Sequence, residues 1–329
     1  MVIDGHAHII VPEITRAARP EEDWRPNVLW KDGQQVIEFG GREIRAAIRE
    51  FVEIETILQA QTAAGIDRIL LCPWVSLLRY EAEPEEGLRI GQIYNEGLAR
   101  LAQSYPDRVT VLGMVPLQEP ELAARELESW MREPGFRGVE VAANVRGEYL
   151  GASRFTPFWE AAEAAGALVF IHPTTRGFDL PVMDEYYLWN AVGNPLETTI
   201  TAAHMILAGV MEDHPRLKVM LAHGGGAIMG LRGRLRHAHS FQPQARSTLG
   251  EPTDASLKRF YYDTVVHDPE VLRSLVYFAG AERVALGSDY PFDMGTDKPT
   301  QIVRTLGLPA DQEALILSGN LTRLLGLEA

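Results

Sequence analysis

Eight short runs rich in Val, Ile and Leu alternate with longer helical patterns along this chain of 329 residues. The runs are VIDGHAHII, IDRILLCPWV, RVTVLGMVPL, FRGVEVAAN, ALVFIHP, LKVMLAHG, RFYYDTVV and RVALGSDYP. Consecutive apolar residues are typical of parallel strands buried on both faces. Eight such units in about 300 residues predict an α/β fold of the (β/α)8 TIM-barrel type. An open doubly wound sheet is the alternative, but no Gly-x-Gly-x-x-Gly turn follows the first run.

Apolar residues recur at helical spacing between the runs. The predicted helices include REFVEIETILQAQTAAG, EGLRIGQIYNEGLARLAQSY, EPELAARELESWMRE, FTPFWEAAEAAG, ETTITAAHMILAGVMEDHP, GAIMGLRGRLRHAHSF and DPEVLRSLVYFAG. Two segments lie outside this pattern. Residues 11–45, with Trp24 and Trp30, form a long insertion after the first strand, which we expect to be a lid near the active site. Residues 291–329 predict extra helices on the outside of one domain that spans 1–329.

Charge and cysteine content limit the class of protein. The chain has 31 Lys and Arg against 45 Asp and Glu, a net charge of −14. We therefore expect no nucleic-acid partner and no membrane surface. Cys72 is the single cysteine, so no intramolecular disulfide can form, which is typical of a reducing compartment. No run approaches about 18 uncharged apolar residues and no leader pattern is present, so we expect a soluble cytoplasmic protein.

Histidines stand near the ends of several predicted strands. The first strand carries His6 and His8, the fifth ends at His172, the sixth at His223 and the eighth at Asp289. In a barrel of this type, catalytic groups lie at the C-terminal ends of the strands. Each histidine alone could be an ordinary core residue, but five titratable groups at one rim predict a shared site.

The spacing of the first two histidines points to a metal. Side chains at i and i+2 of a strand share a face, so His6 and His8 can reach one ion. The same spacing recurs at His237 and His239, where about 100° per helical residue turns the two rings away from each other. Imidazoles with one carboxylate suit Zn²⁺, while Mn²⁺, Fe²⁺ and Co²⁺ are also possible, and a water would complete the ligand set.

Four motifs resemble those of the amidohydrolase superfamily of metal-dependent barrels: DGHAH, FIHP, LAHGGG and LGSDYPF. The resemblance covers nearly the whole chain and includes VLGMVPLQ and the stretch NPLETTITAAHMILAGVMEDHPRLKVMLAHGGG. It is strongest to the branch of aminocarboxymuconate-semialdehyde decarboxylase, whose members are non-hydrolytic decarboxylases. The resemblance implies that His6, His8, His172 and Asp289 bind one divalent metal, with Zn²⁺ expected. It also implies that Asp289 belongs to the catalytic centre and that His223 is the acid/base histidine.

Three further residues are candidates for substrate binding. Arg45 in REIR resembles an arginine that binds a substrate carboxylate, although a surface ion pair is an alternative. Arg234 in LRGRLR resembles an arginine that reaches the neighbouring subunit of a dimer, which implies a homodimer; a solvated helix residue is the alternative. Trp189 in EYYLWN is expected to pack over the pocket, with packing in the core as the alternative. The stretch PTTRG after His172 departs from the branch, whose members typically have an aromatic residue there.

These observations predict a metal-dependent, non-oxidative decarboxylase, a carboxy-lyase, of a small carboxylated enoic, semialdehyde or aromatic acid. His223 would exchange a proton with metal-bound water or with the substrate carbon. The alternative is a hydrolase of the same superfamily, of the lactonase or amidase type. Many hydrolytic relatives bridge two metals through a lysine on the fourth strand, and GVEVAAN has none, although Glu140 could bridge instead. A barrel that only binds a metal or ligand is a second alternative.

Overall fold

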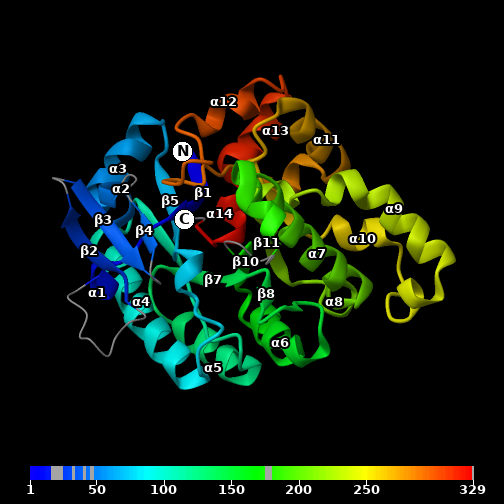
Figure 1. Cartoon of the computed structure of the whole chain (residues 1–329). Helices are drawn as coiled ribbons and strands as arrows, with labels where there is room; N and C mark the ends of the chain where they lie inside the picture. The colour runs from blue at the N-terminus through cyan, green and yellow to red at the C-terminus, as the bar shows by residue number, and fades with distance from the viewer. Residues whose placement is uncertain (16–24, 32–33, 40–41, 45–47, 175–179, 328–329) are drawn as a thin grey trace.

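Eight parallel strands form the centre of the computed structural model, and helices surround them (Figure 1). The structure describes residues 1–15, 25–31, 34–39, 42–44, 48–174 and 180–327. The strands, in their spatial order, are β1 (Ile3–His8), β5 (Arg68–Cys72), β6 (Val109–Gly113), β7 (Phe136–Ala142), β10 (Leu168–His172), β11 (Lys218–Leu221), β12 (Tyr261–Asp263) and β13 (Val284–Ala285). All eight predicted strands are therefore present, in sequence order.

Backbone hydrogen bonds between the first and last strands close the barrel. Gly5 N donates to Leu286 O at 2.8 Å, and His8 N donates to Tyr290 O at 2.7 Å. Asp289 N donates to His6 O at 2.8 Å. The predicted (β/α)8 barrel is confirmed. Its closure places His6 and His8 of the first strand beside Asp289 and Tyr290, which follow the last strand.

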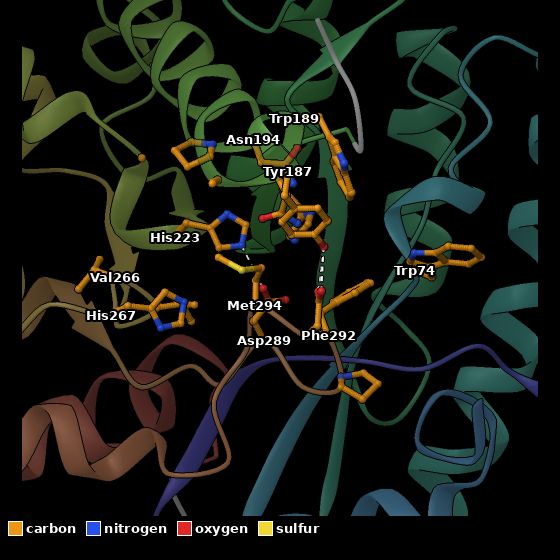
Figure 2. A pocket seen from close by; sticks show the side chains of 18 of the residues that line it. Trp74, Tyr187, Trp189, Asn194, His223, Val266, His267, Asp289, Phe292 and Met294 are labelled. Carbon is orange, nitrogen blue, oxygen red and sulfur yellow. Dashed lines mark hydrogen bonds and ion pairs between the residues drawn. The ribbon is translucent and has the colours of Figure 1, made fainter. Parts of the chain in front are cut away.

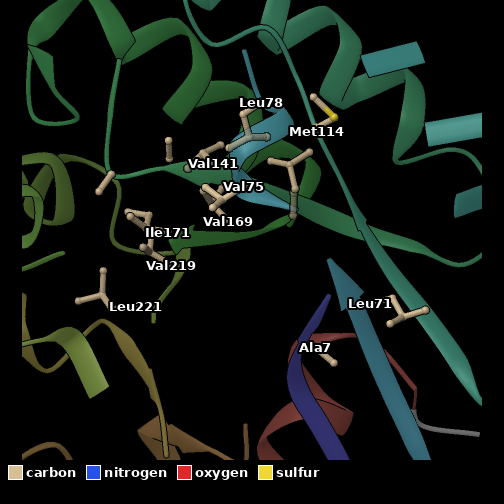
Figure 3. Close-up of a cluster of buried hydrophobic side chains, with 14 of the residues drawn as sticks. Ala7, Leu71, Val75, Leu78, Met114, Val141, Val169, Ile171, Val219 and Leu221 are labelled. Atoms are coloured by element: carbon tan, nitrogen blue, oxygen red, sulfur yellow. The ribbon is translucent and has the colours of Figure 1, made fainter. Parts of the chain in front are cut away.

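Alternate residues of each strand belong to two different cores. On β10, Leu168 and Phe170 pack inside the barrel, whereas Val169 and Ile171 join the cluster between strands and helices that Figure 3 draws. A register shift between Asp4 and Ala7 on β1 interrupts this alternation. The irregular first strand thus keeps its start in the barrel core and still directs both histidines of DGHAH inward.

The helical layer contains α2 (Ile48–Val52), α3 (Ile54–Ala63), α4 (Pro84–Ser104), α5 (Pro120–Trp130), α6 (Thr156–Ala165), α7 (Asn194–Leu207), α8 (Val210–Asp213), α9 (Ile228–Phe241), α10 (Thr253–Leu257) and α11 (Pro269–Ala279). Two predicted helices are interrupted. Glu53 has extended dihedral angles and separates α2 from α3. Gly209, with φ 82°, separates α7 from α8, because a left-handed residue ends a helix. Among the described helices, none combines the length and apolar character that crossing a bilayer requires.

The described part of the insertion contains α1 (Pro12–Thr15) and an antiparallel sheet of β2 (Asn27–Lys31), β3 (Gln34–Phe39) and β4 (Arg42–Ile44). This sheet lies beside the barrel (Figure 1). Its Val36 and Ile37 are buried, so the insertion is packed against the core. Trp24 lies outside the described residues. A second small hairpin, β8 (Asn144–Val145) and β9 (Glu148–Tyr149), follows β7.

The C-terminal segment differs from its prediction. It contains α12 (Pro299–Arg304), α13 (Ala310–Ala314) and α14 (Asn320–Leu324). The expectation that all of it packs outside the barrel is wrong, because Leu321 and Leu324 of α14 join the interior cluster with Ile3 and Leu168. Those strand-start residues would otherwise be open to water, so burying them under apolar side chains stabilises the closed end of the barrel.

Candidate metal centre and active site

The opposite end of the barrel collects the histidines that the sequence singled out. The ring centroids of His6 and His8 lie 5.0 Å apart, and that of His172 lies 5.3 Å from His6 and 5.1 Å from His8. Asp289 Oδ1 lies 3.2 Å from His6 Nε2 and 3.4 Å from His8 Nε2. His223 Nε2 lies 3.2 Å from Asp289 Oδ2. Five residues from four strand ends therefore converge on one point.

The Nδ1 atoms of three of these imidazoles face acceptors. His6 Nδ1 lies 2.7 Å from Asp263 Oδ2, His8 Nδ1 lies 2.8 Å from Pro73 O, and His172 Nδ1 lies 2.9 Å from Pro173 O. A carbonyl or ionised carboxylate only accepts, so each Nδ1 carries the proton in a neutral ring. Each Nε2 then presents a lone pair to the centre, which is the arrangement of metal-binding histidines.

Electrostatics favour a positive charge at this point. Burial lowers the pKa of His6, but the carboxylates of Asp289 and Asp263 outweigh it and raise the pKa to about 10. Burial and the neighbouring imidazoles hold the pKa of His172 well below its usual range. Burial raises the pKa of Asp289, but His6 and His223 hold it well below its usual range. The cluster thus keeps a carboxylate ionised beside a neutral imidazole.

These residues fit a divalent metal ion. Ligand atoms of His6, His172, His223 and Asp289 all lie within 4.8 Å of one another. His172 Nε2 is buried and has no hydrogen-bond partner among the described residues, and Asp289 Oδ1 lies close to Nε2 of His6 and of His8. Buried polar atoms are normally paired, so the unpaired lone pair of His172 Nε2 indicates that this nitrogen binds an ion. His8 adds a fifth candidate ligand, since its Nε2 lies 3.0 Å from that of His6.

His223 differs from the other three histidines in how its ring is held. It begins the short helical turn η5 (His223–Gly225) after β11 and has a left-handed φ of 56°. Its Nδ1 is buried without a hydrogen-bond partner among the described residues. The acceptor near this ring is Asp289 Oδ2, 3.2 Å from Nε2, so the proton of a neutral His223 ring lies on Nε2 and Nδ1 is the nitrogen without a fixed partner. The next residue, Gly224, has φ 61°, and a Cβ there would lie 2.3 Å from Val266 Cγ1, so this turn requires glycine.

A cavity of about 470 Å³ opens above this cluster. His172, His223 and Asp289 line its base, and its walls are largely aromatic and aliphatic (Figure 2). Wall residues include Ile10, Ile37, Phe51, Trp74, Tyr187, Trp189, Val265, Phe292 and Met294. The size and the apolar walls with few polar groups are typical of a site for a small organic molecule.

The predicted substrate-binding residues lie in three different places. Trp189 lines the cavity, and its ring centroid lies 4.8 Å from that of Tyr187. Arg234 is exposed on α9 and is not among the cavity-lining residues. Arg45 lies outside the described residues. His267 follows the seventh strand, a position for which the sequence leaves pocket lining and a helix start as alternatives; it lines the cavity, with a left-handed φ of 57°.

Sequence reasoning missed two features of the site. Asp263 ends β12, the seventh strand, and its carboxylate contacts His6. The rule that functional groups lie at strand ends would have found it. The Tyr187 hydroxyl donates to the carboxylate of Asp293 at 2.9 Å across the cavity wall (Figure 2). No local sequence signal joins these two residues, because they are far apart in the chain.

Comparison with known proteins identifies relatives along most of the chain. The sequence model of the amidohydrolase family matches residues 77–327. The 2-amino-3-carboxymuconate-6-semialdehyde decarboxylase of Dictyostelium discoideum is 34% identical over 252 residues, which are 76% of this chain and 70% of the relative. The gamma-resorcylate decarboxylase of Rhodococcus jostii is 25% identical over 308 residues, 87% of each chain.

A solved structure shows the same fold. It is the 5-carboxyvanillate decarboxylase of Novosphingobium aromaticivorans, complexed with manganese and 4-hydroxy-3-methoxy-5-nitrobenzoic acid. The TM-score is 0.83 at 21% sequence identity, over 99% of this chain and 96% of that one.

Proposed function

The chain belongs to the amidohydrolase family, in its branch of metal-dependent carboxy-lyases, and we propose how its residues divide the work of decarboxylation. One observation carries the proposal: three histidines have an acceptor on Nδ1, whereas the fourth, His223, has none among the described residues. The first three suit metal binding and the fourth suits proton transfer.

His6, His8, His172 and Asp289 are the proposed metal ligands. When bound, the metal would supply Lewis acidity that polarises a substrate oxygen and acidifies water. We propose Zn²⁺, because imidazole nitrogens and carboxylate oxygens are among the ligands that zinc binds in proteins. Mn²⁺ is the alternative that the manganese complex of the 5-carboxyvanillate decarboxylase suggests. The metal content of the purified protein decides between the two ions.

His223 is the proposed acid/base group. Its ring is partly exposed at the base of the cavity, and its Nε2 lies 3.2 Å from Asp289 Oδ2. A protonated His223 would deliver a proton to the substrate carbon that bears the carboxylate. The bond to the carboxylate then breaks, its electron pair restores the double bond, and CO₂ leaves. The proton replaces CO₂ on that carbon, so the reaction needs no oxidant.

The cavity suits a small planar acid. Trp74, Trp189 and Phe292 provide aromatic surfaces against which a conjugated substrate can stack. We propose an aromatic or enoic acid, the substrate types that the names of the relatives describe. Arg45 remains a proposed partner of a substrate carboxylate.

We also propose a homodimer in which Arg234 contributes to the neighbouring site. The observation behind it is the exposure of α9, where Leu231 is 42% and Phe241 65% exposed. Exposed apolar side chains near Arg234 in the same helix are candidate contacts for a second chain. A second copy of the chain is the proposed partner.

A single assay separates decarboxylation from the hydrolase alternative. The metal-loaded enzyme is incubated with a panel of mono- and dicarboxylated enoic and aromatic acids and, in parallel, with lactones and amides. We expect CO₂ release from at least one acid and no cleavage of the esters or amides. Hydrolysis without CO₂ from any acid would contradict the proposal and support the lactonase or amidase type.

A further inference from the structure

We propose that Asp263 is a positioning residue that holds His6 and His223 in their working arrangement through one carboxylate. The inference rests on the proposed roles of these two histidines as metal ligand and acid/base group. Asp263 ends β12, is fully buried, and lies on the barrel interior between β11 and β13. It would act through its neighbours and not by contact with the substrate.

Both carboxylate oxygens of Asp263 are fully used. Oδ2 accepts from His6 Nδ1 at 2.7 Å and from His223 N at 2.9 Å. Oδ1 accepts from Gly224 N at 2.8 Å and from Val265 N at 3.0 Å. Four donors match the four acceptor positions of a carboxylate, so one side chain ties together β1, the turn after β11 and its own strand end.

The contact with His6 determines which nitrogen can bind metal. Because Oδ2 only accepts, the proton of a neutral His6 ring stays on Nδ1, and Nε2 keeps its lone pair for the metal. Partners of this kind hold the ring orientation of metal-binding histidines and raise their basicity. The Oδ2 atom of Asp263 therefore strengthens metal binding through its hydrogen bond to His6.

The contacts with the backbone hold the turn that carries His223. His223 has φ 56° and Gly224 has φ 61°, so two successive N–H groups point at the same carboxylate. A left-handed conformation is unfavourable for a residue with a Cβ and persists only where its surroundings hold it. Without Asp263, these two donors and that of Val265 would be buried without a partner. The same residue therefore acts on the position of the proton-transfer group.

An asparagine at this position would keep the size of the side chain and reverse part of its hydrogen bonding. If the amide NH₂ replaces Oδ1, this donor faces two backbone donors, the N–H groups of Gly224 and Val265, and neither finds an acceptor there. If it replaces Oδ2, it opposes one backbone donor and makes His6 Nδ1 an acceptor. The second orientation has fewer conflicts, and it moves the ring proton to Nε2, where it blocks the metal.

The test compares Asp263→Asn with Asp268→Asn. Asp268 is a matched control, because its carboxylate also accepts backbone N–H groups, those of Glu270 and Val271, at the exposed start of α11. Zn²⁺ affinity is measured by competition with a chromogenic chelator, and kcat and KM are measured at saturating Zn²⁺. We expect Asp263→Asn to bind Zn²⁺ about 10–100-fold more weakly and Asp268→Asn to bind it as the wild type does.

The split between kcat and KM tests the second half of the inference. At saturating Zn²⁺ we expect Asp263→Asn to lose kcat by about tenfold or more with little change in KM, since the turn of His223 loses a partner. A wild-type kcat under these conditions would overturn the link to His223. Unchanged Zn²⁺ affinity would overturn the link to His6, whichever reaction the enzyme performs.

A measurement on the wild-type protein keeps the inference testable if Asp263→Asn does not fold. In the Zn²⁺-loaded wild type, ¹⁵N NMR of the histidine rings is expected to show His6 with zinc on Nε2 and a proton on Nδ1. Zinc on Nδ1 of His6 would overturn the inference. Absence of CO₂ release from the wild type would contradict the proposed reaction and leave both zinc measurements valid.

Discussion

The Nε2 atoms of His6 and His8 lie 3.0 Å apart in the buried end of the barrel, although each ring has its other nitrogen beside an acceptor. With the pKa of His6 raised to about 10, a proton on its Nε2 can join the two nitrogens, and a divalent ion that binds both lone pairs can replace this proton. The neighbouring carboxylate of Asp289 adds to the need for positive charge. The two rings thus share a position for one cation, which a proton can occupy and which a divalent metal ion also fits.

Removal of one of these rings should remove the metal. We expect His6→Ala to purify with well under one equivalent of transition metal and to regain none at micromolar Zn²⁺. His237→Ala is the matched control, because His237 belongs to the same His-x-His spacing on the exposed face of α9. Metal content by mass spectrometry checks both variants. Full metal occupancy in His6→Ala would exclude His6 from the ligand set.

Replacement of His223 should separate proton transfer from metal binding. We expect His223→Ala to keep its metal and to lose kcat by about 10²–10⁴-fold, the usual contribution of a general acid or base. Metal content and turnover are measured on the same preparation. Since His223 lies within ligand range of the cluster, loss of metal together with activity would instead show that it is a ligand.

Trp189 should affect substrate binding more than turnover. Its ring lines the cavity beside Tyr187, so Trp189→Ala removes a stacking surface that contributes about 0.5–1.5 kcal/mol. We expect KM to rise about three- to tenfold with a smaller change in kcat. Trp130→Ala is the control, because Trp130, the last residue of α5, packs on Phe136 and should change thermal stability alone. An unchanged KM in Trp189→Ala would remove this residue from the site.

The proposed role of Arg234 across a dimer can be tested by complementation. Arg234→Ala and His223→Ala should each be nearly inactive alone. In a mixed dimer, one site combines an intact His223 with an intact Arg234 from the other chain. Random pairing would therefore restore roughly a quarter of wild-type activity. No recovery in co-expressed variants, or a monomer by light scattering, would contradict the proposal.

Glu197 should make the stability of the fold depend on pH. Its side chain is fully buried on α7 and accepts from Asn144 and Thr174. Burial raises its pKa from 4.5 to about 7. The unfolded chain releases this proton from pH 4.5 upward while the folded chain keeps it to about pH 7, so rising pH favours unfolding across that window. The free energy of unfolding falls by roughly 3 kcal/mol between these two pKa values, and Glu197 adds no further pH dependence above about pH 7.

Glu197→Gln should remove this dependence, because a neutral amide oxygen can still accept both hydrogen bonds. Urea unfolding of the variant and the wild type at about pH 5 and about pH 8 measures the difference. Glu121→Gln is the matched control, since Glu121 occupies the first turn of α5 but is exposed. An identical pH dependence in Glu197→Gln and the wild type would contradict this assignment.

Much of the fold followed from local patterns. Alternating apolar runs and helical periods predicted all eight strands, because parallel strands buried on both faces need continuous Val, Ile and Leu. The breaks at Glu53 and Gly209 were not predicted, since apolar periodicity continues across both residues. The position of α14 was also missed, because an amphipathic segment does not specify whether it covers the side or the end of a barrel.

The sequence by itself determined which side chains could share a site, since strand periodicity and strand ends place His6, His8, His172, His223 and Asp289 at one rim. Only the tertiary structure decided how each of them is held. The Nδ1 partners of His6 and His8 come from distant parts of the chain, whereas that of His172 is the adjacent carbonyl of Pro173. The lack of a partner for His223 Nδ1 among the described residues has no local signature. Asp263 illustrates the reason: its carboxylate lies 257 positions from His6 in sequence and 2.7 Å from it in the barrel. Side-chain periodicity is a local property of the backbone, whereas hydrogen-bond partners depend on how a closed sheet brings its first and last strands together.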